Sequence, residues 1–530
     1  MNKNIYLKWT MPLLIALLMG SCISNNLNDN PTASTSMDPN IQLTTVQLLH
    51  STNADDWHRY LIYPGGFMNH WTNDWATINY GGAGQKNDSY FAHFWGVYYP
   101  VIIREAVDLV ERTRDVEKYT NVHAAAKVAK VEHFLRLTDF YGDIPYFDAG
   151  KAYYSGVFKP AYNKQEDIYK DFFKELKEAV ELFDPSGDVV TGDIYFNGNT
   201  ERWIKYANSL RLRIAMRLIK VDKTWAETEA KLAIEAGVMA SNDDICYIQH
   251  DNQQAEFESS SNGIGNRMLL DKSSTFRISR ELVETMENTN DPRLRYYCGS
   301  YLEDGPRTEI TDLLYNHYGS YSKIALPAQH YSWSYTNSVP AIVLNVNGAD
   351  VEVSALLQYM QPSKLVSNPG APYIRMSYAE VEFLIADALA RNMNIGVGGD
   401  ANSHYIAGLD AAVRQWTLFG ASIDEDALTK FKADNKLQAS NELNQINTQL
   451  WVLHFLDPFE TWSNWRRSGL PVDQLKFHQY HSGNESDGQT PRRLQYPVAE
   501  QTSNPEGLKE AVDRMNGVDS WIGRLWWDKK

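Results

Sequence analysis

The chain has 530 residues, of which 43% are hydrophobic, and a chain of this size can bury a large core. Its 66 acidic residues outnumber its 50 lysines and arginines and give a net charge of −16 at pH 7. This charge argues against a nucleic-acid-binding protein, because phosphate contacts require clustered lysine and arginine side chains.

The first 21 residues predict a signal peptide. Lys3 and Lys8 supply a positive start, and a short apolar run, 11–19, follows. The run has about nine residues, whereas a membrane-spanning helix needs about 20. The small residues Gly20-Ser21 and then Cys22 favour a lipoprotein signal, in which Cys22 is lipidated. Met19 stands where such signals usually have leucine, and an ordinary secretory signal with an incidental cysteine is the alternative.

Residues 22–40 are polar and contain asparagine, proline and serine, a composition that predicts a flexible tether. No long Gly/Ser-rich or proline-rich linker interrupts 41–530, which we expect to form a single domain. No other segment approaches a membrane span. Cys246 and Cys298 could pair in an oxidising compartment, but their spacing leaves the question open.

Helical periodicity dominates the rest of the chain. Between 165 and 183, apolar residues recur at spacings of three and four, with lysine and glutamate opposite. Pro185 and Gly187 are expected to end this helix. A second stripe covers 203–218, and a third covers 226–234 with Gly237 as its terminator.

A later pair of helices is expected between 377 and 416. Ser377 and Glu380 have the spacing of a capping box at the start of the first helix, and Gly420 closes the second. Further stripes at 101–110, 128–135 and 443–453 bring the number to about eight helices. We therefore predict a mostly α fold of paired helices, with the repeats too degenerate to show a consensus.

Long irregular segments separate the helical blocks. Residues 240–340 are rich in Asn, Ser, Tyr and Gly and show little periodicity. An alternating stretch at 342–346 precedes Asn347-Gly348 and a second alternating stretch, which predicts a minor β-hairpin. Long loops in a compact domain are usually functional or without fixed structure. The aromatic content, 15 Trp and 31 Tyr, favours function here.

Motifs of catalytic and metal centres are missing from the sequence. There is no nucleophile elbow, HExxH, phosphate loop or EF-hand. Gly81-Gly82-Ala83-Gly84 lacks the lysine of a phosphate loop and is expected to be a turn, and 193–199 lacks the bidentate glutamate of a calcium loop. We expect no catalytic residue, metal or cofactor, although two of the many acids could still meet in space as a glycoside-cleaving pair.

Two groups of arginines lie within apolar stripes. Arg211, Arg213 and Arg217 share the 203–218 stripe, and Arg466 and Arg467 follow Trp465. Their expected role is structural, pairing with acids on neighbouring helices.

A series of motifs runs along the chain in a fixed order. They are CISNNLNDNP (22–31), DFYGDIPYFDA (139–149), WIKYANSLRLRIAMRL (203–218), PYIRMSYAEVEFLIADALAR (372–391), FETWSNWRRSGLP (459–471), PRRLQYPVAEQTSN (491–504) and RLWWD (524–528). Together they resemble the SusD/RagB nutrient-binding outer-membrane lipoproteins of Bacteroidetes, and most closely the second SusD-like subfamily. Asp387 departs from the glutamate that related proteins often carry.

The resemblance implies a scaffold of four degenerate tetratricopeptide-like helix pairs with irregular loops across one side. It implies a protein anchored by Cys22 to the outer membrane and exposed at the cell surface. It also implies a SusC-like TonB-dependent barrel as the partner, capped by this lipoprotein as a lid, and an oligosaccharide or other nutrient as the ligand.

The ligand is expected on aromatic loops. A sugar ring has apolar faces and hydroxyl edges, and therefore suits indole and phenol platforms flanked by amides and charges. One stretch carries Trp71, Asn73, Asp74, Trp75 and Tyr80; the other carries Tyr331, Trp333, Tyr335 and Asn337. The first two tryptophans are four residues apart, so a buried helical stripe is the alternative. The second stretch alternates, which favours one face of an extended segment, with loop packing as the alternative.

Two other functions remain open from the sequence. One is a surface glycoside hydrolase, and the other is a helical-repeat scaffold of the cell envelope. The paired helices allow the scaffold, but the aromatic loops do not favour it.

Overall fold

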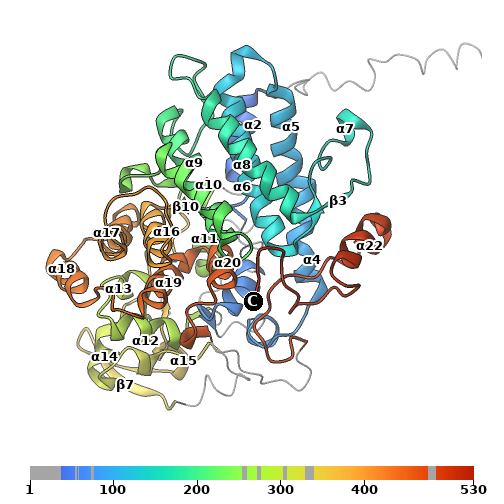
Figure 1. Ribbon diagram of the computed structural model, residues 1–530. Coiled ribbons are helices and arrows are strands. Elements are labelled where there is room, and N and C mark those ends of the chain that lie inside the picture. The colour runs from blue at the N-terminus through green and yellow to red at the C-terminus, as the bar shows by residue number, and fades with distance from the viewer. Residues whose placement is uncertain are drawn as a thin grey trace, which may run out of the picture.

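The computed structural model describes residues 37–53, 57, 59–72, 77–253, 260–270, 276–302, 307–328, 339–475 and 485–530. Within these residues the fold is mostly helical, as the sequence predicts (Figure 1). The expected signal peptide and Cys22 lie outside the described residues. So does the expected tether as far as residue 36, while its last two residues, Pro39 and Asn40, already form the first turn of α2 (Pro39–Leu48).

Every predicted apolar stripe forms a helix. These helices are α5 (Arg104–Thr113), α6 (Thr120–Tyr141), α8 (Gln165–Leu182), α9 (Thr200–Arg217), α10 (Lys223–Glu235), α16 (Tyr378–Ala390), α17 (Ala401–Arg414) and α19 (Glu442–Leu453). The predicted total of about eight is nevertheless too low. The connections contain many further helices, including α4 (Asp88–Val97), α12 (Arg280–Asn288), α14 (Thr311–Tyr318), α18 (Glu425–Asp434), α20 (Pro458–Ser468) and α22 (Pro505–Arg514). With two or three turns each, these helices are too short to establish a clear period.

The long helices stack in sequence. Helix α5 packs on α6, α6 on α8, α8 on α9, and α9 on both α10 and α16. Helix α16 then packs on α17 and α19, and α19 packs on α20. In Figure 1 this order runs from the blue and teal helices through the green pair to the orange group, with α9 and α16 joining the two halves.

The predicted helix ends are confirmed, with one difference in the capping box. The Ser377 hydroxyl accepts a hydrogen bond from the Glu380 backbone N–H at 3.3 Å, as an N-cap does. The Glu380 carboxylate, however, pairs with Arg213 of α9. Gly237 and Gly420 follow their helices with φ of +94° and +88°, a left-handed conformation that favours glycine.

The strands form five two-stranded antiparallel ladders in the described residues. They are β1 (Trp71–Thr72) with β5 (Arg277–Ile278), β2 (Ile144–Pro145) with β3 (Tyr162–Asn163), β4 (Cys246–Ile248) with β10 (Tyr373–Met376), β6 (Cys298–Gly299) with β9 (Gln361–Pro362), and β7 (Ile342–Val346) with β8 (Ala349–Val353). The last is the hairpin predicted from Asn347-Gly348, both of which have positive φ. Cys246 and Cys298 lie in different ladders as free, buried thiols, which answers the question of their pairing.

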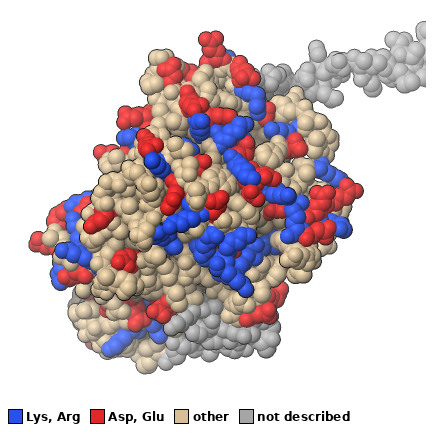
Figure 2. Space-filling view, in the orientation of Figure 1, with Lys and Arg blue, Asp and Glu red and all other residues tan. Residues whose placement is uncertain are grey.

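The acidic net charge is unevenly spread. Figure 2 shows lysines and arginines gathered near the middle of the face on which Figure 1 places the C-terminus. Partial burial, together with the nearby Arg492 and Arg524, lowers the pKa of Lys220 in spite of Asp528. The local excess of positive charge therefore differs in sign from the chain as a whole.

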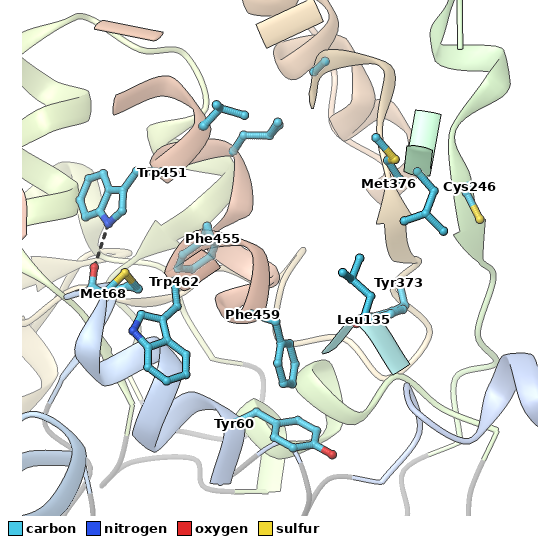
Figure 3. Close-up of a cluster of buried hydrophobic side chains, with 14 of the residues drawn as sticks. Tyr60, Met68, Leu135, Cys246, Tyr373, Met376, Trp451, Phe455, Phe459 and Trp462 are labelled. Atoms are coloured by element: carbon cyan, nitrogen blue, oxygen red, sulfur yellow. Dashed lines mark hydrogen bonds between the residues drawn. The ribbon is translucent and has the colours of Figure 1, made fainter. Parts of the chain in front are cut away.

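Aromatic side chains fill much of the core. The Trp451 indole N–H donates to the Met68 carbonyl at 2.8 Å, which ties α19 to the segment before β1 (Figure 3). Phe459 of α20 lies beside Tyr60, with ring centroids 4.8 Å apart. Among the described residues, six tryptophans are fully buried: Trp57, Trp71, Trp203, Trp451, Trp462 and Trp527. Much of the high aromatic content therefore belongs to packing and not to a binding surface.

Arg211, Arg213 and Arg217 of α9 each reach a different helix or helices. Arg211 pairs with Glu229 of α10, and Arg213 forms a two-bond pair with Glu380 of α16, at 2.6 and 2.7 Å. Arg217 pairs with Glu460 of α20 and, at 3.3 Å, with Asp139 of α6. The predicted structural role of these arginines is confirmed.

Charge complementarity keeps the buried acids ionised. Burial opposes the ionisation of Glu460, but the attraction of Arg213 and Arg217 outweighs it and lowers the pKa of Glu460 to about 2. Glu380 is similar: burial opposes its ionisation, and Arg213 and His454 nevertheless hold its pKa below the usual range. Glu380 and Glu460 are therefore charged together with their arginines, whereas burial outweighs Arg217 and Arg466 at Asp139 and raises the pKa of its carboxyl.

The two arginines of the second group, Arg466 and Arg467, have different partners. Arg467 donates to Asp387 of α16 at 2.9 Å, which confirms the predicted acid pairing. Arg466 instead donates to the backbone carbonyls of Asp139 and Arg492, and its guanidinium lies 3.9 Å from the Trp462 ring centroid. For Arg466, carbonyl oxygens and an aromatic face take the place of the expected acid.

We predict that Arg217→Met lowers the free energy of unfolding by about 3–5 kcal/mol, because it leaves Asp139 and Glu460 buried with part of their compensation removed. Chemical denaturation measures the change. Arg414→Met is the matched control, since Arg414 pairs with Glu425 at the surface, where the two side chains are 40% and 62% exposed. Such an exposed pair contributes about 0–1 kcal/mol. Equal losses in the two variants would contradict the assigned role of the buried network.

Candidate functional site

The structure describes two of the aromatic residues proposed as ligand contacts. Trp71 and Tyr80 lie within the described residues. The others lie outside them, and their role stays a prediction: Asn73, Asp74, Trp75, Tyr331, Trp333, Tyr335 and Asn337.

Trp71 is a core residue in this structure. It lies in β1 and is fully buried. Its ring stacks on Phe455, with centroids 4.6 Å apart and an interplanar angle of 22°, and meets Phe276 edge-on at 6.0 Å. Protein covers its ring faces, as in the buried alternative of the sequence analysis, although the local backbone is extended and not helical.

Tyr80 is half-buried near the surface. It belongs to a single π-helical turn, Thr77–Gly81, and its ring meets Tyr90 edge-on at 5.8 Å. The guanidinium of Arg59 lies 5.3 Å from the Tyr90 centroid. The following glycines form the predicted turn, and Gly81 packs so closely on the Ile62 carbonyl that a Cβ atom would not fit.

The described ends of the two aromatic stretches adjoin. The Thr72 hydroxyl, at the end of β1, donates to the carbonyl of Pro327 at 3.0 Å and lies 3.3 Å from that of Ala328. Thr72 is the last described residue before 73–76, and Ala328 is the last before 329–338. Two stretches far apart in the sequence therefore start from one point of the fold.

A third segment begins and ends nearby. Asn69, just before β1, donates through its side-chain amide to the Gln474 carbonyl at 2.9 Å. After 476–484, the backbone N–H of Glu485 donates to the Gly84 carbonyl at 2.9 Å, a few residues along the chain from Tyr80. We call this region, defined by Thr72, Ala328, Gln474 and Gly84, the loop pole.

A polar groove lies beside the loop pole. It has a volume of about 370 Å³, within the range of small-ligand sites. Residues of α12 and α19 line it, together with Asp473, Gln474 and Asn435. The residues that line it are almost all of polar type: Glu281, Glu284, Thr285, Asn288, Thr289, Asn435, Asn444, Gln445, Thr448, Gln449, Asp473 and Gln474, with Tyr405 as the aromatic member.

The groove is joined to the loop pole by hydrogen bonds. The Glu281 carboxylate accepts from the Ala328 backbone N–H at 2.8 Å, and the Gln474 amide lies 3.4 Å from the Thr285 hydroxyl. Among the described residues, the side chains of Asn288, Asn444 and Thr448 have no hydrogen-bond partner. Amides and hydroxyls of this kind offer donors and acceptors to a hydroxyl-rich ligand.

Sequence reasoning missed this groove. The sequence feature that could have indicated the groove is the polar run of α19, in which Asn444 and Thr448 are four residues apart and share one face. The same spacing holds for Glu284 and Asn288 of α12. Neither helix alone indicates a site, because a polar helix face is usually a solvated one.

The described residues show neither a metal-binding cluster nor a membrane-spanning helix. No cluster of three or more His, Cys, Asp or Glu side chains there could hold a metal ion. Asp193, from the stretch checked for calcium ligands, instead accepts hydrogen bonds from Gln47, Trp203 and its own loop backbone. None of the described helices combines the length and apolar character needed to cross a bilayer.

Comparison with known proteins gives consistent matches. The model of the SusD-like family, described as starch-binding and associating with the outer membrane, matches residues 28–497. A solved chitin-binding protein is 31% identical, with a TM-score of 0.79, over 93% of this chain and all of that one. A Bacteroidetes SusD-like protein is 30% identical, with a TM-score of 0.84 and the same coverage.

A more distant chitin-binding SusD homologue from Flavobacterium johnsoniae shares the fold. It is 22% identical, with a TM-score of 0.69, over 92% of this chain and 97% of that one. No protein of curated function matches the chain.

We predict that Trp71→Ala costs about 3–5 kcal/mol of stability, the usual magnitude for removing a large aromatic side chain from a core. Denaturant unfolding of the variant measures this loss. Tyr80→Ala is the comparison, since its half-buried ring is expected to cost clearly less. A Trp71→Ala protein with the stability of the parent would show that the ring is not part of the core.

Proposed function

Since the chain belongs to the SusD-like family, we propose that it is a non-catalytic, cell-surface glycan-binding lipoprotein that captures an oligosaccharide for a SusC-like TonB-dependent barrel. The observation that supports a shared binding site is the contact of Thr72 with 327–328. It brings the beginnings of the two aromatic stretches together. Trp75 and Trp333 are then expected to contribute to one ligand surface.

Two features support a carbohydrate as the ligand. The relatives include proteins named as chitin-binding, and the family is described as starch-binding. The groove beside the loop pole offers amide, hydroxyl and carboxylate groups set among the apolar stems of the same side chains. Oligosaccharides of chitin and of starch are therefore the first ligands to test, with peptides as the second class.

The alternative of a surface glycoside hydrolase has weaker support. Family membership favours binding without catalysis, and the sequence carries no recognised catalytic motif. Purified protein is expected to leave chitin and starch oligosaccharides uncleaved. Turnover that disappears on mutation of a single carboxylate would establish the hydrolase instead.

We predict that Trp333→Ala weakens oligosaccharide binding about 30-fold, corresponding to about 2 kcal/mol for the loss of a central aromatic contact. Trp75→Ala is expected to act in the same direction. Isothermal titration with chitin and starch oligosaccharides gives the affinity, and thermal melting gives the stability. A large drop in melting temperature with unchanged affinity would place these tryptophans in packing.

The groove provides a separate test. Asn444→Ala with Thr448→Ala removes two polar groups of α19 from the lining and should weaken binding if the ligand extends into the groove. Trp225→Ala is the control, because this half-buried tryptophan packs on Phe173 of α8, away from the loop pole. It should affect stability and leave the affinity unchanged.

We predict that Cys22→Ala prevents lipidation and releases the protein from washed outer membranes. The parent is expected to purify from detergent extracts together with a SusC-like barrel. Normal membrane retention of the variant would refute the anchor. Purification at native expression without any barrel would refute the proposed partner, while leaving glycan binding to its own test.

A further inference from the structure

One segment exposes an unusual concentration of apolar side chains. Helix α7 (Ala152–Ser155) and its flanks carry five large hydrophobic residues in the stretch 147–158. Tyr153 is 92% exposed and Phe158 81%, and Phe147, Tyr154 and Val157 are exposed as well. Elsewhere in the described chain, exposed large hydrophobic residues are scattered. Contiguous exposed apolar surface generally marks an interaction site.

The segment is held in place by its base. Tyr154 donates to Asp108 of α5 at 2.6 Å, and the Lys151 ammonium lies 3.2 Å from Glu111 of the same helix. The Asn163 side chain accepts from the backbone N–H groups of Tyr146 and Phe147, at 2.9 and 3.0 Å. The aromatic rings are therefore presented outward from a fixed support.

The same part of α5 also holds the start of the described chain. Asp108 accepts from the Gln42 amide of α2 at 2.8 Å. Arg112 donates to Gln42 at 2.6 Å and to the Met37 carbonyl. Figure 1 shows α7 on the same end of the molecule as the chain entering α2. Met37 and Ile41, 44% and 60% exposed, add to the apolar surface at this end.

The length of chain before this point limits where a lipid anchor lies. Met37 comes fifteen residues after Cys22, and a chain spans at most about 3.6 Å per residue. A lipid on Cys22 therefore lies within about 55 Å of Met37, whatever path the chain takes. The surface around Met37 and α7 is therefore within reach of the membrane that holds the lipid.

We infer that the 147–158 segment is a membrane-docking element that places Tyr153 and Phe158 in the interface of the lipid bilayer. The inference rests on the anchoring part of the proposed function. Aromatic side chains are favoured at the boundary between lipid headgroups and acyl chains. A lipid anchor supplemented by such contacts holds a protein more firmly and fixes its orientation.

The charge of the segment agrees with this partner. Within 147–158 the single acid, Asp148, is balanced by Lys151, and Lys159 follows directly, although the chain as a whole carries −16. A surface rich in lipid phosphates attracts lysines and repels acids. The lobe formed by α7 is also mostly tan, that is uncharged, in Figure 2.

The test measures partition of the processed chain, residues 22–530 with Cys22→Ala, into vesicles of phosphatidylethanolamine and phosphatidylglycerol. Removing the lipid isolates the contribution of the segment. Tyr153→Ser with Phe158→Ser is expected to weaken partition at least tenfold. Val343→Ser with Val518→Ser is the matched control, because these residues are 64% and 63% exposed on other elements, and it should leave partition unchanged.

Two further measurements make the outcome decisive. Melting temperature should stay unchanged in both double variants, since all four side chains are exposed, and oligosaccharide affinity should also stay unchanged. Absence of vesicle binding by the parent, or equal binding by both double variants, would overturn the inference. So would loss of barrel co-purification or of oligosaccharide affinity in the Tyr153/Phe158 variant with normal vesicle partition. Mass measurement of Cys22 in the native protein reports separately on the anchor.

Discussion

Arginines buried between helices set the arrangement of the stack. A guanidinium cannot be neutralised by losing its proton, so each must meet an acid, a carbonyl or an aromatic face once it is buried. Arg213 and Arg217 are two positions on α9 whose acids come from α6, α16 and α20. Sliding any of these helices along its axis would separate charges in the interior, and the penalty selects one register. Apolar packing alone would tolerate several.

The same centre supports the loop pole. His454, at the end of α19, lies 3.2 Å from the Glu380 carboxylate. The next residue, Phe455, is stacked between Trp71 of β1 and Tyr297, with centroids 4.6 Å from each. One turn of chain thus links the charge network to the strand from which the first aromatic stretch begins. Residues that carry ligand specificity are then free to vary, because the point from which they start is fixed by the core.

The sequence predicts the parts of the molecule that depend on local pattern. The long helices follow from their periodicity, and the 342–353 hairpin follows from Asn347-Gly348, whose positive φ values suit the turn. Contacts between distant segments could not be predicted. Arg217 was expected to find an acid, but nothing local identifies Asp139 or Glu460. Trp71 illustrates the limit: its spacing from Trp75 suits a stripe or a platform equally, and its burial depends on Phe455 from the far end of the chain.

Aromatic side chains consequently have three different surroundings in this protein, and composition alone does not separate them. Trp203 and Trp462 fill the core, where Trp203 donates to Asp193 and Trp462 lies against the guanidinium of Arg466. The loop pole gathers the ends of segments rich in Trp and Tyr beside a polar groove. Tyr153 and Phe158 lie neither in the core nor in a groove.

A core residue is retained because its loss unfolds the protein, whereas an exposed aromatic adds nothing to folding and increases the risk of association. Clustered exposed apolar side chains usually mark an interaction site, and the start of the described chain beside α7 favours the membrane as the partner here.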